Sequence, residues 1–285
     1  MPASLLILKE AAGLTGEYQH TLDSKGRLFI PATLRDELGD TFYLTVSDER
    51  CLRAYSAESW QSFVDRVRAM PYVDRKKMRP FFACAAKCEL DAQGTYLINL
   101  MSSPGSGKTT TLLRTIETLK DELRMGVMEA DIDSDVDAEK IAGAGVKSIQ
   151  LHTGGMCHLD AGMTEQGLRE IGTGDLDLVV LENVGNLVCP AEFDTGAVKN
   201  AMILSVPEGH DKPLKYPLIF TVCDALIINK IDVLPYFDFD MDKVVEYAHM
   251  RNPRLKIFPI SAKTGEGVDA WCDWLRQQVK DWTEA

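Results

Sequence analysis

The sequence lacks long apolar runs, and none approaches the ~18–20 residues of a membrane-spanning helix. Its first residues, MPASLLILKE, include an apolar patch but no basic stretch before it and no small-residue cleavage site after it. That pattern is not the one of a signal peptide. We therefore expect a cytoplasmic protein without a membrane partner. In that compartment the seven cysteines are expected to be thiols or metal ligands rather than a disulfide framework.

An excess of positive charge is also absent, since the formal net charge is −12. Residues 1–94 hold 13 Lys/Arg and 13 Asp/Glu, whereas the remainder holds 18 and 30. The C-terminal part would repel phosphates, which excludes non-specific binding of nucleic acid by that part. The neutral N-terminal part could bind DNA only through a local cluster of basic residues.

A phosphate-binding loop is predicted within LINLMSSPGSGKTTTLLRTIETLK, residues 97–120. An apolar strand leads to SSPGSGKT, which matches the Walker A pattern except that Ser102 replaces its first glycine. Backbone N–H groups of this loop would face a β-phosphate, Lys108 would bridge the β- and γ-phosphates, and the Thr109 hydroxyl would bind Mg²⁺. A chance turn rich in glycine and serine would lack this flanking strand and helix. The predicted nucleotide-binding residues here are Gly105, Ser106, Gly107, Lys108, Thr109 and Thr110.

The base is predicted from LIINKID, residues 226–232, an apolar strand that ends in Asn-Lys-x-Asp. The Asp232 carboxylate can accept hydrogen bonds from both N1–H and the exocyclic amine of guanine, which adenine does not offer. Lys230 can lie along the base, and Asn229 can tie this loop to the phosphate loop. The stretch PISAKTGEG follows, and it resembles a loop whose backbone contacts guanine O6 through Ser261, Ala262 and Lys263. Together these patterns predict GTP rather than ATP.

Two segments are expected to respond to the γ-phosphate. LDLVVLENVG, residues 176–185, is a strand ending in Glu-x-x-Gly, where Glu182 could reach Mg²⁺ through water and the Gly185 N–H could contact the γ-phosphate. The acidic stretch ADIDSDVDAEKI, residues 130–141, is either a solvated loop or a switch loop. We predict that Asp131 binds Mg²⁺ through water or acts in catalysis. The other predicted catalytic residues are Lys108 and Glu182.

Strands are predicted at 95–101, 125–130, 177–182, 224–229 and 255–260, with helices between them, one of which spans about 109–119. This alternation predicts a parallel α/β sheet with the nucleotide at the carboxyl ends of the strands.

Cys157, His158 and Cys189 are candidate ligands of a second metal. The first two are adjacent, and Cys189 directly follows the Glu-x-x-Gly segment. Two thiolates and an imidazole suit Ni²⁺ or Zn²⁺, and they leave a position for a ligand from a second subunit. Alternatively, these cysteines are small core residues and the adjacent pair is accidental. Cys223 and Cys272 are expected to be core residues.

About residues 95–280 resemble HypB, the GTPase of nickel–iron hydrogenase maturation and of nickel incorporation into urease, and we assign residues 95–285 to a HypB-like GTPase domain. The resemblance rests on NLMSSPGSGKTTTLLRTIETLK, EADIDSDVDAEKI, LHTGGMCHLDAGM, LVVLENVGNLVCPAEFDTG, VCDALIINKIDVLPYFDFD and PISAKTGEGVDAW. It implies a P-loop NTPase of the SIMIBI class that dimerises across its metal site. It also implies that nickel passes to the hydrogenase large subunit with a HypA-like co-chaperone. The Cys-rich N-terminal nickel motif of many HypB proteins is not visible in this sequence.

Residues 16–94 resemble MraZ, a transcription regulator built from two AbrB-like half-repeats, and this implies a small α+β segment. The first Leu-Asp-x-x-Gly-Arg signature is intact in LDSKGRLFIP, but the second, LDAQG, runs directly into the predicted GTPase strand. The resemblance would make Lys25, Arg27 and Arg35 DNA contacts, whereas the zero net charge favours an ordinary solvated hairpin. Residues 1–15 fit neither family.

Two function classes follow for the whole chain. One is a GTP-hydrolysing nickel metallochaperone, and the other is a DNA-binding regulator of MraZ type that carries a GTPase domain. The break within the second signature indicates a chimeric or rearranged gene.

Overall fold

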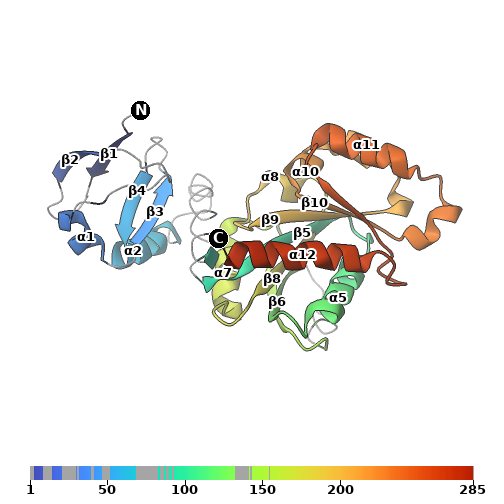
Figure 1. Cartoon of the computed structure of the whole chain (residues 1–285), viewed down its shortest axis with the longest axis horizontal. Coiled ribbons are helices and arrows are strands. Elements are labelled where there is room, and N and C mark those ends of the chain that lie inside the picture. Colours follow the sequence, from blue (N-terminus) through green and yellow to red (C-terminus); the bar gives the residue numbers. More distant parts are fainter. Residues whose placement is uncertain are drawn as a thin grey trace. The chain divides into compact units, whose positions relative to one another are not determined.

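The chain forms two compact units, residues 1–85 and 86–285 (Figure 1). The computed structural model describes residues 3–8, 15–20, 30, 32–39, 42–46, 52–68, 83, 87, 90, 91, 93–131, 141, 143–153 and 155–284. Every helix in this described part is too short or too polar to cross a bilayer.

Paired strands and two helices form the described part of the first unit, which confirms the small α+β segment. β1 (Ala3–Leu8) pairs with β2 (Thr15–His20), and β3 (Phe42–Val46) pairs with β4 (Leu52–Ser56), both antiparallel. The helices are α1 (Ala32–Leu38) and α2 (Ala57–Arg68). Trp60 of α2 stacks on Tyr43 of β3 with ring centroids 4.8 Å apart. The first fifteen residues, which the sequence left unassigned, thus include a strand.

A seven-stranded parallel sheet forms the second unit and confirms the predicted α/β class. All five predicted strands are present, and two more, β7 and β9, were not predicted. β9 lies between the phosphate-loop strand β5 and the strand β10 that carries Asn-Lys-x-Asp. In spatial order the strands are β11 (Lys256–Pro259), β10 (Ala225–Asn229), β9 (Lys199–Ser205), β5 (Tyr96–Ser102), β8 (Leu178–Gly185), β6 (Met125–Asp131) and β7 (Lys147–His152).

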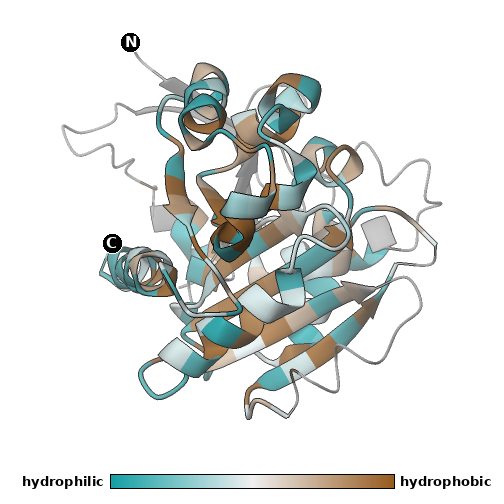
Figure 2. Ribbon diagram, turned by 90° about the vertical axis from the view of Figure 1, so that its right-hand side faces the viewer, coloured by the Kyte–Doolittle hydropathy of each residue, from teal (hydrophilic) through white to brown (hydrophobic). Residues whose placement is uncertain are grey.

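Helices cover both faces of this sheet. Tyr96, Ile98 and Leu100 of β5 pack in one cluster with α5 (Lys108–Leu119) and α12 (Val268–Thr283). The alternate residues of β5 face the other side, where two clusters lie under α7 (Ala161–Ile171) and under α10 (Pro217–Val222) with α11 (Met241–Arg251). This alternation is the period-two pattern of a strand that is buried on both faces. In Figure 2 the apolar segments gather in the sheet.

Short elements complete the second unit. They follow β8, β9 and β10 and lie near the carboxyl ends of these strands. They are α8 (Cys189–Glu192), η2 (Val206–Glu208), α9 (Lys212–Lys215) and η3 (Ile231–Tyr236).

The segment before β5 packs with the second unit. Leu90 is 1% exposed and belongs to the cluster under α7. The Thr173 hydroxyl donates a hydrogen bond to the side chain of Gln93, and Lys87 lies 3.8 Å from Asp194. The division between the units therefore falls at 85/86, upstream of the 94/95 boundary that the two family resemblances suggest.

Gly267, at the start of α12, packs closely against the end of β11, and substitution tests this contact. Its φ is +74°, and a Cβ there would lie 2.2 Å from the carbonyl oxygen of Pro259. Gly265 has a φ of +90° but no atom within 4 Å of such a Cβ, so it is a matched control for the backbone strain alone. We expect Gly265→Ala to cost about 1–2 kcal/mol of unfolding free energy, as for any left-handed non-glycine residue. Gly267→Ala should cost roughly a further 1–3 kcal/mol from overpacking. Urea denaturation measures both, and equal losses would contradict the packing argument.

Candidate functional site

The phosphate loop joins a buried strand to a helix, as the sequence predicts. β5 is buried along its whole length, and α5 begins at Lys108 after Gly105 (φ +75°) and Gly107 (φ +93°). A Cβ on Gly107 would lie 2.5 Å from Asn229 Nδ2, so both the conformation and the close approach require glycine there. The Ser106 hydroxyl is buried without a hydrogen-bond partner among the described residues. An orphaned donor and a helix N-terminus fit the binding of a phosphate group.

Asn229 joins three loops that are distant in the sequence. Its Nδ2 donates to the carbonyl of Ser106 in the phosphate loop (2.9 Å). Its Oδ1 accepts from the backbone N–H of Lys230 (2.7 Å) and of Ala262 (3.1 Å). Lys230 strengthens the same link, because its Nζ donates to the carbonyl of Gly105 (2.7 Å). The predicted role of Asn229 as a tie between loops corresponds to these contacts.

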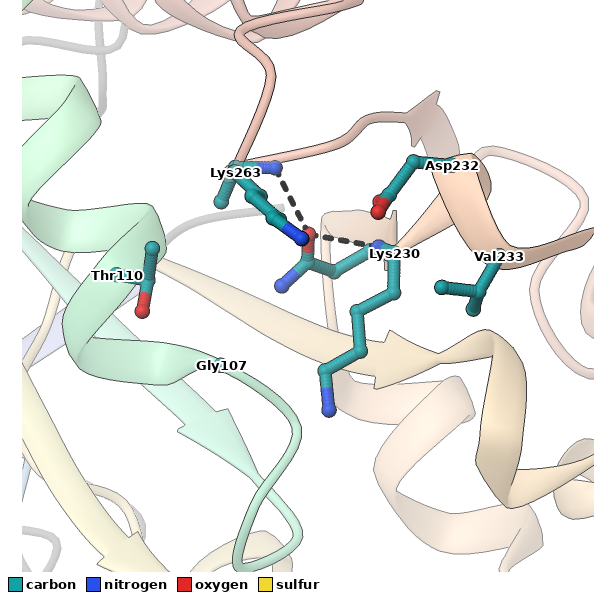
Figure 3. A pocket seen from close by; sticks show the side chains of 8 residues that line it. Gly107, Thr110, Lys230, Asp232, Val233 and Lys263 are labelled. Atoms are coloured by element: carbon teal, nitrogen blue, oxygen red, sulfur yellow. Dashed lines mark hydrogen bonds between the residues drawn. The ribbon is translucent and has the colours of Figure 1, made fainter.

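A pocket of about 210 Å³ lies between these loops (Figure 3). Asp232 is one of its walls, and the Ser261 hydroxyl holds this carboxylate by donating to Oδ1 (2.7 Å). Arg114 of α5 fixes the opposite loop by donating to the carbonyls of Ala262 (2.9 Å) and Lys263 (3.2 Å). The structure therefore gathers the predicted base-binding residues around one opening. The pocket is lined by Gly107, Thr110, Asn229, Lys230, Asp232, Val233, Ala262 and Lys263.

Where the sequence predicts the γ-phosphate, Lys108 Nζ lies 3.6 Å from Glu182 Oε1, and both side chains are largely buried. Glu129 of β6 pairs in register with Glu182, and its exposed fraction is only 3%. The sequence analysis did not name Glu129 as a candidate site residue. A glutamate inside the apolar strand MGVMEAD could have indicated a buried carboxylate near the site. Carboxylate and hydroxyl oxygens are hard donors, so Glu182 and Thr109 fit the binding of Mg²⁺.

The Glu-x-x-Gly segment lies against the phosphate loop. Gly185 pairs with Ser102 of β5, and a Cβ on it would lie 3.3 Å from Pro104. Asp131 ends β6, but its side chain and residues 132–140 lie outside the described part of the chain. The predicted roles of Asp131 and of the acidic switch loop therefore stay predictions.

Two of the three predicted soft-metal ligands meet. Cys157 Sγ and Cys189 Sγ are 2.9 Å apart, and Cys189 opens α8. The hydrogen bond with Cys157, burial and the charge of Glu192 raise the pKa of the Cys189 thiol. The ring of His158 instead stacks on Phe193 with centroids 3.6 Å apart. Among the described residues, no group of three or more His, Cys, Asp or Glu side chains lies close enough to hold a metal ion. The thiol pair suits Ni²⁺ or Zn²⁺ but is an incomplete ligand set.

The other described cysteines are core residues, as predicted. Cys223 and Cys272 are each 1% exposed. Burial raises the pKa of Cys272 to about 11, so this thiol is protonated and unreactive at neutral pH.

Two family models match the chain. The model described as CobW/HypB/UreG, nucleotide-binding domain, matches residues 96–259. The model described as MraZ protein, putative antitoxin-like, matches residues 14–79. The first match covers the sheet and the candidate nucleotide site except the loop with Ser261, Ala262 and Lys263, and the second confirms the resemblance seen upstream.

The chain is also similar to several HypB maturation factors. Hydrogenase maturation factor HypB of Azotobacter chroococcum mcd 1 is 44% identical over 197 residues, which are 69% of this chain and 65% of that protein. The chain thus spans about two thirds of the length of that relative. Hydrogenase/urease maturation factor HypB of Helicobacter hepaticus is 38% identical, over 75% of this chain and 93% of that protein. The crystal structure of HypB from Helicobacter pylori in complex with nickel has a TM-score of 0.66 at 38% identity, over 70% of this chain and 94% of that one.

The hydrogen bonds of Asn229 lead to a prediction for the candidate nucleotide site. Asn229→Ala should lower the free energy of unfolding by about 1–3 kcal/mol, because it leaves the buried N–H of Ala262 unpaired. It should also weaken binding of a guanine nucleotide, since the phosphate loop and the base loop lose their common tie. Asn229→Asp keeps the two accepted hydrogen bonds and loses the two that Nδ2 donates, to the Ser106 carbonyl and to Thr111 Oγ1, so its affinity should be intermediate. Calorimetric titration with GDP measures this order, and wild-type affinity in both variants would contradict it.

Proposed function

We propose a function from one premise: the chain belongs to the CobW/HypB/UreG family of nucleotide-binding domains. The proposed function is that of a GTP-hydrolysing nickel metallochaperone for the maturation of nickel–iron hydrogenase. The role in hydrogenase maturation is supported by the names of the relatives, and nickel as the transported metal is supported by the H. pylori structure in complex with nickel. The alternative, a DNA-binding regulator of MraZ type, has less support, because residues 1–94 carry no net charge. Among its candidate DNA contacts, Arg35 lies exposed on α1, and Lys25 and Arg27 lie outside the described residues.

One observation carries this proposal. The phosphate loop contributes Gly107 to the pocket at Asp232 and lies against the Glu-x-x-Gly segment, which leads directly to one thiol of the pair. Gly185 contacts the phosphate loop, and Cys189 follows it by four residues. A nucleotide-dependent movement of this segment would therefore move one thiol relative to the other.

In the proposed reaction, water attacks the γ-phosphorus of GTP and the bond to the β–γ bridging oxygen breaks, giving GDP and phosphate. Lys108 would neutralise the negative charge that develops on the β- and γ-oxygens, and the Gly185 N–H would hold the γ-phosphate. Mg²⁺, bound near Thr109 and Glu182, would supply further positive charge at the phosphates. Glu182 keeps Lys108 in place through their ion pair, and we assign Asp131 to the orientation of water.

Nickel is the proposed cargo, and zinc is a second metal that the same thiols could bind. Cys157 and Cys189 would bind it as thiolates, with His158 as a third ligand once its ring leaves Phe193. Three ligands leave a tetrahedral shell open, and a homodimer with two-fold symmetry would bring a second set to the same place. The proposed partners are a HypA-like co-chaperone and the hydrogenase large subunit, in the cytoplasm.

The nucleotide assignment predicts two distinct losses. Lys108→Ala should lower the GTP hydrolysis rate about 10²-fold or more, because the transition-state charge loses its main cation. Asp232→Asn should instead weaken guanine binding by about 1.5–3 kcal/mol, because a charged acceptor of two hydrogen bonds is lost. Phosphate release measures the first variant, and competition between GTP and ATP measures the second. Equal wild-type affinity for ATP and GTP would contradict the assignment.

The metal assignment predicts binding of Ni²⁺ or Zn²⁺ near one ion per chain, together with dimerisation. Cys157→Ala and Cys189→Ala should each lose both effects and keep their GTP affinity. Cys272→Ala is the matched control, since its thiol is buried away from the pair and should bind no metal. Equilibrium metal titration with sedimentation, in the GDP and GTP-analogue states, measures these outcomes.

The affinity for metal should fall as pH is lowered, because thiolate ligands must lose their protons and the pKa of Cys189 is raised. Unchanged metal affinity in both cysteine variants would show that the thiols are not ligands. Wild-type affinity in His158→Ala would limit the site to the two thiols.

A further inference from the structure

Three asparagine side chains cross the middle of the sheet. Asn183 of β8 donates through Nδ2 to Asn99 Oδ1 of β5 (3.0 Å), and Asn99 Nδ2 donates to Asn200 Oδ1 of β9 (2.9 Å). Asn99 and Asn183 are 1% and 0% exposed, respectively. The row, which we call the asparagine ladder, joins three adjacent strands by their side chains.

The ladder lies on an apolar face that would otherwise be continuous. Leu97, two residues before Asn99, belongs to the cluster under α7, and Met101, two residues after it, belongs to the cluster under α10 and α11. Buried amides in such a place lower stability unless every donor and acceptor is paired. In the ladder both ends of Asn99 and of Asn183 are paired. A row of apolar residues would fill the same space, so packing alone does not explain the amides.

The position of the ladder coincides with a β-bulge. Leu100 pairs with Glu182 and Ser102 with Gly185, so one residue of β5 stands opposite two residues of β8, Asn183 and Val184. A bulge leaves a backbone group outside the ladder of sheet hydrogen bonds and changes the direction of the strand. The Asn183 Oδ1 accepts the N–H of Val184 (2.9 Å), which stabilises the bulge from within.

The bulge lies between the two groups that the mechanism places at the γ-phosphate. Glu182, which pairs with Lys108, comes directly before it, and Gly185, which contacts Pro104, ends it. The extra residue shifts the register of β8 after Glu182. The bulge thus determines where Gly185 lies relative to the phosphate loop.

The far end of the ladder is fixed to the next strand connection. Asn200 donates through Nδ2 to the carbonyl of Val222 (3.4 Å), and its backbone N–H donates to Asp224 Oδ2 (3.0 Å). Lys199 pairs with the same Asp224 at 2.7 Å. The ladder therefore joins the bulge of β8 to the connection between α10 and β10.

We propose that Asn183, Asn99 and Asn200 are positioning residues that hold the bulge of β8, and through it Gly185, in the geometry that recognises the γ-phosphate. This inference rests on the proposed GTPase function and adds residues that touch neither nucleotide nor metal. The geometry of Gly185 would favour GTP over GDP, because only GTP has the γ-phosphate that Gly185 would contact.

The test compares affinities for GDP and for GTPγS, the kcat and KM for GTP, and the thermal midpoint. Asn99→Leu removes both hydrogen bonds of the central rung, and Asn200→Ala cuts the half-buried outer end with less risk to folding. The matched control is Asn252→Ala. Asn252 also holds backbone groups, since its Nδ2 donates to the carbonyl of Cys223 (2.8 Å) and its Oδ1 accepts the N–H of Arg254 (3.0 Å). It acts on the 222–224 connection beyond the outer end of the ladder, and none of its side-chain hydrogen bonds is to a ladder residue.

In Asn99→Leu we expect the affinity for GTPγS and the kcat to fall about tenfold, because a small misplacement of a positioned group is costly. The affinity for GDP should stay at the wild-type value. Asn200→Ala should shift the ratio of GTPγS to GDP affinity in the same direction by a smaller factor, and Asn252→Ala should leave it unchanged.

An unchanged ratio in both ladder variants, with stability lowered or not, would overturn the proposal and leave the ladder a structural feature only. If Asn99→Leu yields no folded protein, the ratio in Asn200→Ala decides by itself. A wild-type protein that binds GTPγS but hydrolyses no GTP would contradict the proposed GTPase function, and the affinity ratio would still test the ladder.

Discussion

The hydrogen bonds of Asn229 are the constraint on which the candidate site depends. Parallel strands bring their carboxyl ends to one edge of the sheet, but this alone does not fix the loops that follow them. A single amide does so here, because it donates to the phosphate loop and accepts from two backbone groups beyond β10 and β11. Gly107 has no side chain because that amide occupies the space. The base pocket is thus a consequence of loop–loop hydrogen bonds rather than of any one loop.

Sequence patterns predicted what depends on local signals. The strands before the phosphate loop and before Asn-Lys-x-Asp are apolar runs that end in turn residues, and such runs identify buried parallel strands. β7 was missed because its residues are mostly half-exposed, which leaves a weak apolar signal at the edge of the sheet. β9 was missed because its apolar run, AMIL, is short and starts directly after polar residues. β9 lies between β5 and β10, and this strand order cannot be predicted from the local sequence of β9.

Contacts between distant segments could not be predicted from the sequence. Cys157 and His158 are neighbours in the chain, yet only the thiol reaches Cys189, because the imidazole is buried against Phe193. The asparagine ladder likewise depends on the register of strands that are about a hundred residues apart. The family resemblances placed the junction of the two units by motif, whereas packing placed it earlier through Leu90, whose side chain completes a cluster of the second unit.

Lys230 is the one non-glycine residue with a positive φ (66°) within the described part of the chain. Glycine or asparagine would hold that conformation at lower cost. A lysine is instead kept there, and it directs its ammonium group to the carbonyl of Gly105. Replacing Lys230 with glycine would relieve the backbone strain but remove the hydrogen bond that joins the phosphate loop to the loop after β10. At position 230 the backbone conformation and the link between the two loops therefore favour different amino acids.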